Sequence, residues 1–298
     1  MDEHLRIYTD ASNDKEPREE AAGHVRAYCH REGMVALKTL ISGDLRKYML
    51  HDTSSVRENA MQLLAESLEA VLQTSEMTGL LRLTTEAAGG VKRHDAEMLF
   101  AFFVGRFEDY VSVGGAMQCV LHLVKYKDSE LVTPEQCAEL LTAMSKMNVP
   151  AMVQEWRKTN LELYQTIFAN SSYVNHVRTL DGKANEFIGA FKDSVWLEKD
   201  PRCLIRGLSA ANTILRTFGN SQTDIDDTLL EALFETTSCY FPITFRPPKD
   251  DPHQITPESL IDLLQQIFSS TPRLGKHVFP FLIEKIESEL DAAKIQSF

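Results

Sequence analysis

Apolar residues recur every three or four positions along almost the whole chain. Over residues 56–72 they mark one face of a helix, with polar residues such as Glu58 and Glu66 between them. This spacing lines residues up on one side of an α-helix, whereas a half-buried strand requires strict alternation. No stretch shows sustained alternation of apolar and polar residues, and only Tyr240 to Phe245 has the composition of a short extended segment. The sequence therefore predicts an all-α fold.

Capping signals mark where these helices begin and end. Thr133-Pro-Glu-Gln136 and Ser55-Val-Arg-Glu58 have the form of a capping box, in which a hydroxyl accepts a free amide and the later side chain reaches back. Prolines at the first position of a helix strengthen four of the starts: Pro134, Pro201, Pro257 and Pro272. The expected helices cover residues 19–31, 34–50 with a break near Ser42-Gly43, 55–73, 76–88, 95–109, 113–126, 134–147, 150–169, 172–180, 183–193, 201–218, 225–238, 257–269 and 273–292.

The spacing of these helices narrows the architecture. Helices expected from residues 55, 95 and 134 begin about 40 residues apart, the period of HEAT-type helical hairpins. Such hairpins stack, because one hairpin cannot hide both of its apolar faces alone. A compact helical bundle with similar loop spacing is the alternative. We predict a flexible lead-in over residues 1–17 and a HEAT-type α-solenoid of antiparallel helical hairpins over residues 18–298.

Charge and composition exclude several classes of partner. The chain has 31 Lys and Arg residues against 43 Asp and Glu, a formal net charge of −12, and its basic groups form no stripe. A field of this sign repels phosphate backbones, so we expect no direct binding of DNA or RNA. Residues 1–30 lack the apolar segment of a signal peptide, and no apolar run reaches the roughly 18 residues of a membrane span. We therefore expect neither secretion nor a membrane location.

The five cysteines do not have the spacing of a metal site. Cys29, Cys119, Cys137, Cys203 and Cys239 are scattered and odd in number, which is typical of reduced, intracellular thiols in a leaderless chain. Zinc and iron–sulfur sites need soft ligands close together in the sequence. We therefore expect no metal ligands and no cofactor.

Two other groups suggest chemistry but have simpler explanations. Cys239, with His253 further along, suggests a cysteine-dependent enzyme, but the expected C-terminal end of a helix disfavours a thiolate, and a buried structural cysteine is preferred. Asp224-Ile-Asp-Asp227 suggests a calcium loop, but Leu229 stands where that loop needs glycine. Acidic residues also favour a helix N-terminus. The sequence therefore predicts no catalytic residue, and a protein that is not an enzyme.

One loop interrupts the helical pattern. The segment from Cys239 to His253 has four prolines and three aromatic residues, and proline both fixes the backbone and lacks a donor, which predicts an ordered, non-helical segment. Its aromatic side chains either pack under the following hairpin or are displayed on a rigid scaffold to bind a partner. The candidate residues for either role are Tyr240, Phe241, Pro242, Phe245, Arg246, Pro247, Pro248, Asp250, Asp251 and Pro252.

The same loop and its flanks carry a family resemblance. The stretches concerned are Glu198-Lys-Asp-Pro-Arg-Cys-Leu204, Leu233 to Pro252, Ser270-Thr-Pro-Arg273 and Leu282 to Leu290. In this order they resemble the N-terminal domain of the MMS-nineteen family. The similarity is strong over residues 185–298 and weaker over 33–126, whereas residues 1–32 and 171–199 depart from the family pattern.

The resemblance implies a HEAT-repeat adaptor of the cytosolic iron–sulfur assembly targeting complex. Members link a late assembly module to apo clients such as DNA helicases, polymerases and repair enzymes, and carry no cluster of their own. For this chain the resemblance implies a cytoplasmic and nuclear protein-binding scaffold whose partners are the targeting subunits and apo iron–sulfur clients. The alternative is a scaffold acting directly on the helicase-containing transcription and excision-repair factor. Because assembly subunits dock on C-terminal repeats in this family, the chain ending at Phe298 is expected to be one arm of an adaptor, as a fragment or a natural short form.

Overall fold

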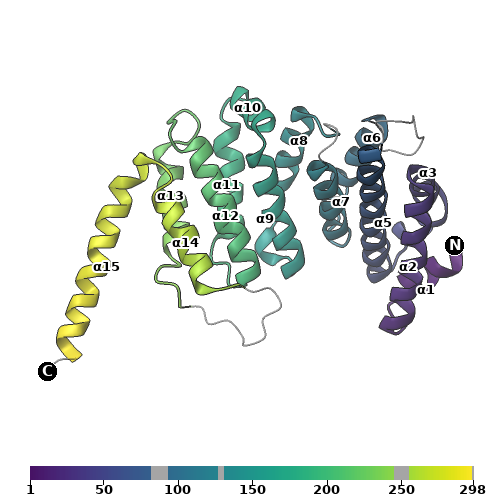
Figure 1. Cartoon of the computed structure of the whole chain (residues 1–298), viewed down its shortest axis with the longest axis horizontal. Helices are drawn as coiled ribbons and strands as arrows, with labels where there is room; N and C mark the ends of the chain where they lie inside the picture. The colour runs from purple at the N-terminus through teal and green to yellow at the C-terminus, as the bar shows by residue number, and fades with distance from the viewer. Residues whose placement is uncertain (82–92, 127–130, 245–254, 297–298) are drawn as a thin grey trace. The chain divides into compact units, whose positions relative to one another are not determined.

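The protein is built from α-helices (Figure 1). A computed structural model describes residues 1–81, 93–126, 131–244 and 255–296, with only the backbone described for 74–81 and 289–296. Within these ranges there is no β-strand, and the prediction of an all-α fold is confirmed. The chain divides into two compact units, Met1–Met147 and Asn148–Phe298. No described helix is both long and apolar enough to span a bilayer.

The first unit packs around the long helix α5. Helices α2 and α7 both pack against α5, α1 packs on α2 and α5, and α6 packs on α7. Leu63, Leu64 and Leu68 of α5 are fully buried in this core. The helices of this unit are α1 (Asp2–Thr9), α2 (Lys15–Glu32), α3 (Met34–Thr39), the π-helix η1 (Leu40–Asp44), α4 (Arg46–Met49), α5 (Ser54–Leu81), α6 (Arg93–Val104), α7 (Val113–Lys125) and α8 (Pro134–Met144).

Residues 1–17 are the segment for which the sequence predicts a flexible lead-in. They include α1, which buries Leu5 and Tyr8 against the helices that follow. Arg18 donates to the Tyr8 carbonyl at 2.9 Å, and the Asn59 side chain donates to the Thr9 carbonyl at 3.0 Å. The helix is too short to show a periodic pattern, so its apolar contacts and these two hydrogen bonds fix a segment that looks featureless in the sequence.

The helix boundaries of this unit agree with the sequence in most places. Helices α5, α6 and α8 begin at Ser54, Arg93 and Pro134, close to the three expected starts, and η1 lies where the break near Gly43 was expected. The prediction of separate helices over 55–73 and 76–88 is wrong, since α5 continues to Leu81 and residues 82–92 lie outside the described chain. No proline interrupts this stretch, so the helical hydrogen bonds continue. The HEAT-type assignment of the pairs stays a prediction.

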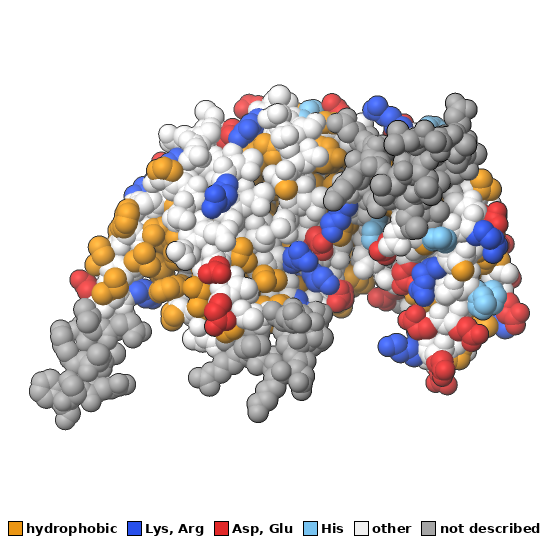
Figure 2. Space-filling model, viewed as in Figure 1, with side chains coloured by type: hydrophobic (Ala, Val, Ile, Leu, Met, Phe, Trp, Pro, Cys, Tyr) orange, Lys and Arg blue, Asp and Glu red, His pale blue; other side chains and the backbone are white. Residues whose placement is uncertain are grey.

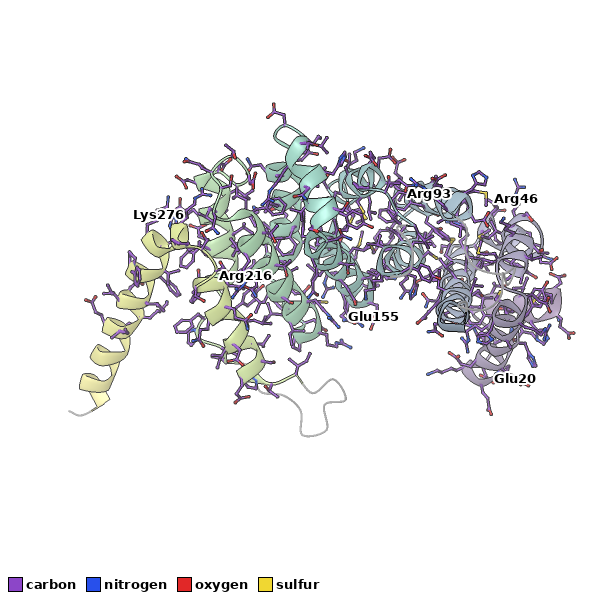
Figure 3. All side chains as sticks on the ribbon, turned by 45° about the horizontal axis from the view of Figure 1, so that its top comes forward. Glu20, Arg46, Arg93, Glu155, Arg216 and Lys276 are labelled. Atoms are coloured by element: carbon purple, nitrogen blue, oxygen red, sulfur yellow. The ribbon has the colours of Figure 1, made fainter. Side chains whose placement is uncertain are left out.

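The second unit has two layers of helices. Helix α12 packs between α9 and α14 in one layer, while α11 packs on α13 and α13 on α15 in the other. In Figure 3, side chains fill the spaces between neighbouring helices from Glu155 on α9 to Lys276 on α15. The elements are η2 (Val149–Ala151), α9 (Gln154–Ala169), α10 (Ser171–Thr179), α11 (Lys183–Val195), α12 (Pro201–Phe218), α13 (Asp227–Ser238), α14 (Pro257–Phe268), η3 (Pro272–Leu274) and α15 (Gly275–Gln296).

The predicted caps explain why these helices start where they do. Thr133 forms the full capping box with Gln136, its hydroxyl accepting at 3.2 Å and its amide donating at 2.9 Å. Asp200 and Thr256 cap α12 and α14, and each is followed by proline. Each cap satisfies an amide that would otherwise lack a partner in the first turn.

A close contact between α5 and α7 depends on Gly115. A Cβ atom at this position would lie 2.7 Å from the backbone carbon of Met61, closer than packed atoms come. Gly115 therefore lets the two helices approach closely. At Gly189, in α11, an added Cβ atom would have no neighbouring atom within 4 Å.

We expect Gly115→Ala and Gly189→Ala to change stability in opposite directions. The first forces α5 and α7 apart and should lower the free energy of unfolding by about 1–3 kcal/mol. The second gains helix propensity without a clash and should raise it by about 0.5–1 kcal/mol. Urea unfolding followed by circular dichroism measures both changes. A neutral Gly115→Ala would contradict the close α5–α7 contact.

Candidate protein-binding surfaces

The predicted signature loop begins directly after α13. The Tyr240 hydroxyl donates to the Val195 carbonyl at 3.0 Å, and burial raises the pKa of this hydroxyl. Tyr240 thus ties the end of α13 to the end of α11, and it precedes a cis peptide bond between Phe241 and Pro242. The other candidate residues lie outside the described residues: Phe245, Arg246, Pro247, Pro248, Asp250, Asp251 and Pro252.

Phe241 belongs to an aromatic cluster that joins α13, α14 and α15. Its ring centroid lies 5.8 Å from that of Phe281 and 6.4 Å from that of Phe268. Phe234 completes the cluster, at 5.8 Å from Phe268 and 5.5 Å from Phe281. Tilted and edge-to-face pairs at these distances add to the stability gained from burial alone. Phe241 therefore packs between the last two helices.

An apolar groove of about 500 Å³ opens beside this cluster, between α14 and α15. Phe241, Leu264 and Leu282 line it, and Phe279 and Ile283 on α15 are 69% and 55% exposed. Figure 2 shows hydrophobic side chains gathered over these two helices, and Figure 1 shows α15 diverging from α14 towards its C-terminal end. Contiguous apolar surface of this kind is typical of protein–protein contact sites.

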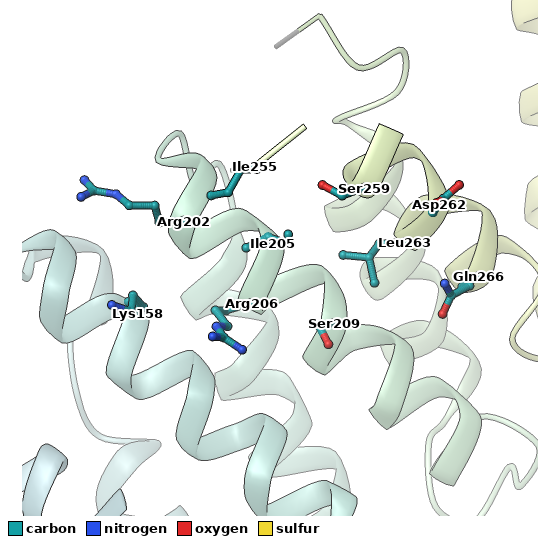
Figure 4. A pocket seen from close by; sticks show the side chains of 10 residues that line it. All are labelled: Lys158, Arg202, Ile205, Arg206, Ser209, Ile255, Ser259, Asp262, Leu263 and Gln266. Atoms are coloured by element: carbon teal, nitrogen blue, oxygen red, sulfur yellow. The ribbon is translucent and has the colours of Figure 1, made fainter. Parts of the chain in front are cut away.

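A second groove, of about 580 Å³, runs between α9, α12 and α14 (Figure 4). Three cationic side chains line it, Lys158 on α9 and Arg202 and Arg206 on α12. Helix α14 supplies the opposite side, with one carboxylate at Asp262. The remaining lining residues are Ile205, Ser209, Ile255, Ser259, Leu263 and Gln266.

The three cations of this groove differ in their partners. Lys158 pairs with Glu155 on the same exposed helix face at 3.3 Å. Arg202 pairs with the capping residue Asp200 at 2.7 Å, and this hydrogen bond holds the pKa of the Asp200 carboxyl below its usual value. Arg206 is exposed and has no hydrogen bond or ion pair to any residue in the described ranges. Within the described residues, the groove therefore offers one guanidinium that no carboxylate engages.

Comparison with known proteins bears on what such surfaces bind. A family model described as MMS19_N, Dos2-interacting transcription regulator of RNA-Pol-II, matches residues 43–298. The chain belongs to this family. The resemblance read from the sequence is thereby confirmed, and the match covers the helices from α4 onwards and the signature loop.

Relatives from distant organisms share this MMS19_N region. MMS19 nucleotide excision repair protein homologs from Danio rerio and Homo sapiens are each 32% identical to the chain, over 73% and 60% of its length. The homolog from Arabidopsis thaliana is 25% identical over 99% of the chain. The matched regions are 20%, 18% and 24% of these relatives, so the chain spans about a fifth to a quarter of their length.

The MMS19-type stretch from Glu198 to Leu204 has a structural role. Arg157 of α9 forms a two-pronged ion pair with Glu198, at 2.7 and 3.0 Å, and Glu198 also accepts the amides of Lys199 and Asp200. The Glu198 side chain is only 4% exposed. Its hydrogen bonds raise the pKa of the Arg157 guanidinium. This pair joins α9 to the turn before α12.

The stretch Ser270-Thr-Pro-Arg273, between α14 and α15, also joins neighbouring elements through hydrogen bonds. The Arg273 guanidinium donates to the carbonyls of Gly219, Ser221 and Ile225 and to the Asp227 carboxylate, at 2.8–3.1 Å. Thr271 donates to Gly219 as well, at 3.2 Å. Arg273 therefore holds the loop between α12 and α13 against the start of α15.

The acidic group from Asp224 to Asp227 is explained by protein contacts. Asp226 caps α13 by accepting from the Leu229 amide at 2.8 Å, and Asp224 pairs with Arg178 at 2.9 Å. Asp227 pairs with Arg273 at 2.8 Å. The role at a helix start agrees with the preferred sequence interpretation. No group of three potential metal-ligating side chains occurs in the part of the chain that the structure describes.

The cysteines differ from the prediction at one position. Cys29, Cys119, Cys137 and Cys203 are buried, but Cys239 is exposed, contrary to the buried structural role expected for it. The reason is its place at the C-cap of α13, where the chain leaves the core and its thiol donates to the Thr236 carbonyl at 3.2 Å. Partial burial raises the pKa of the Cys239 thiol, which disfavours the reactive thiolate form.

The groove between α9, α12 and α14 was not predicted from the sequence. The available signal was the polar stripe of α12, opposite its apolar stripe, which places Arg202, Arg206, Ser209, Thr213 and Arg216 at three- and four-residue spacing. A stripe of this kind is usually a solvated helix face. Only the packing of α9 and α14 on either side of α12 makes it the bottom of a groove.

We expect Arg157→Met to lower the free energy of unfolding by about 3 kcal/mol, because it leaves the buried Glu198 carboxylate without its cation. Adding Glu198→Gln should recover part of this loss, since the neutral amide no longer needs a countercharge. Denaturant unfolding measures both changes. Lys158→Met is the matched control, and removing its exposed pair with Glu155 should change stability by less than about 1 kcal/mol. A double variant no more stable than Arg157→Met would contradict this account.

Proposed function

We propose that this chain is a protein-binding module of an adaptor that delivers iron–sulfur clusters to apo clients of DNA repair, replication and transcription, in the cytoplasm and nucleus. The observation that carries the proposal is the MMS19_N match over residues 43–298. The relatives are named as nucleotide excision repair protein homologs. The proposed partners are the iron–sulfur assembly targeting subunits and apo clients such as DNA helicases.

The surface of the second unit supports a binding role. Two grooves open on it, one apolar beside Phe279 and one polar beside Arg206. Their walls are helices held by packed cores and by ion pairs such as Arg157 with Glu198. A rigid helical wall presents its side chains without the ordering cost of a flexible loop. The proposal assigns no catalytic step to this chain.

The buried thiols support a role in which the cluster is cargo. Metal ligation requires the thiolate form of cysteine. Burial raises the pKa of the thiols of Cys29 and Cys203 to about 11 and that of Cys119 well above its usual value. These thiols therefore stay protonated near neutral pH, which disfavours competition with a client for iron.

The printed description of the family supports a second candidate. It names a transcription regulator of RNA-Pol-II, which fits a scaffold acting directly on the helicase-containing transcription and excision-repair factor. The two candidates differ in one requirement. A delivery adaptor must prefer the client that lacks its cluster, whereas a direct scaffold binds the helicase whether or not the cluster is present.

Binding of one iron–sulfur helicase in its apo and holo forms tests the proposal. We expect the chain to bind the apo form at least about tenfold more tightly, a difference of roughly 1.4 kcal/mol. Biolayer interferometry with immobilised chain measures both affinities. Cys239→Ser is the matched control, because it removes the exposed thiol and should leave both affinities unchanged.

Other outcomes of this experiment decide between the alternatives. Equal affinity for both forms would overturn cluster delivery and favour the direct scaffold. Failure to bind either form would overturn client binding by this segment. Loss of apo-helicase binding in Cys239→Ser would revive a thiol-dependent activity.

A further inference from the structure

The polar groove of the second unit has the shape of a trough between three neighbouring helices. Because α12 packs against both α9 and α14, its outward face forms the bottom of the trough, and α9 and α14 form the sides (Figure 4). Side-chain hydrogen bonds cross between the helices. Gln165 of α9 donates to Ser209 at 2.7 Å, and Asn212 donates to Gln266 of α14 at 2.9 Å. These bonds hold the walls at a fixed separation.

The charges of this trough have the opposite sign to those of the chain as a whole. The lining holds Lys158, Arg202 and Arg206 against the single carboxylate of Asp262, in a chain of net charge −12. The pair of Lys158 with Glu155 is solvent-exposed, and such pairs contribute little free energy, so Lys158 can turn towards a new anion at small cost. Arg206 needs no release, because it has no partner among the described residues. The lining side chains therefore carry a net positive charge, three cations against one carboxylate.

Apolar and hydrogen-bonding groups accompany these cations. Ile205, Ile255 and Leu263 give apolar surface, and Ser259 and Gln266 present a hydroxyl and an amide. An extended peptide matches this mixture, because its side chains alternate between two faces while its backbone offers free donors and acceptors. From the geometry and the charge we infer that the groove between α9, α12 and α14 binds an extended acidic segment of a partner protein, with carboxylates at Arg206 and Lys158 and apolar side chains at Ile205 and Leu263. This inference rests on the protein-binding part of the proposed function.

Nucleic acid fits the same groove less well. Affinity for a phosphate backbone grows with the number of phosphates that cations neutralise, and a stable complex needs several. Among the residues that the structure describes, Arg206 is the one groove cation without a partner, and a chain of net charge −12 repels polyanions. A peptide needs only a few carboxylates at the cations, and it uses the apolar lining as well.

Fluorescence anisotropy with a defined peptide tests this inference on the intact chain. The probe is a labelled, Glu-rich peptide of about ten residues with leucines between the glutamates, which at roughly 3.3 Å per residue can follow the trough. We expect it to bind, to weaken at an ionic strength of about 0.5 M, and to lose about tenfold in affinity in Arg206→Glu. Lys199→Glu makes the same charge change at an exposed residue outside the groove and should leave affinity within about twofold.

The remaining outcomes overturn the inference. They are a dissociation constant for the Glu-rich peptide weaker than about 1 mM, equal losses in Arg206→Glu and Lys199→Glu, or tight binding of the matching Gln-rich peptide. Tighter binding of a single-stranded oligonucleotide of similar length, lost in Arg206→Glu, would assign the groove to nucleic acid. Because the probe contains no client sequence, these results are independent of the apo-helicase experiment.

Discussion

Burial of one face of α12 is the constraint on which the second unit depends. Leu204, Leu208, Ala211, Leu215 and Phe218 follow the three- and four-residue spacing of a single stripe, and all are buried. Helix α12 packs most extensively against α9, and Gly207 lets Val195 of α11 approach closely. The opposite face must then point outwards, which puts the polar stripe with Arg206 between α9 and α14. One amphipathic helix thus fixes both the core and the position of the polar groove.

Local signals predicted most helices, and tertiary contacts decided the exceptions. Apolar stripes and capping residues such as Thr133 and Asp200 are local patterns, formed by residues only a few positions apart. The sequence therefore displays them directly. Helix α1 was not predicted from the sequence, because its order comes from contacts with α2 and α5. The polar groove was not predicted either. Lys158, Arg206 and Asp262 are far apart in the sequence, and helix packing brings them to one groove.

The residues that carry the family resemblance are largely those that fasten one helix pair to the next. Glu198 binds Arg157 across the turn before α12, Arg273 holds the loop after α12, and Tyr240 reaches back to Val195. Buried polar groups of this kind need their full set of partners, which makes each turn specific in sequence. The described part of the signature loop is therefore informative mainly about architecture. Phe241, an aromatic residue of this loop, has two roles. It packs in the aromatic cluster, and it also lines the apolar groove.

The distribution of the cysteines also limits how the protein can be damaged. Oxidation of a thiol to sulfenic acid or a disulfide requires both access and thiolate character. Four of the five thiols are buried, and in Cys29, Cys119 and Cys203 burial also suppresses the thiolate. Peroxide or a disulfide reagent would therefore react chiefly with Cys239, at the end of α13 in the second unit. Oxidation of cysteine should therefore concentrate at this position rather than in the helical cores.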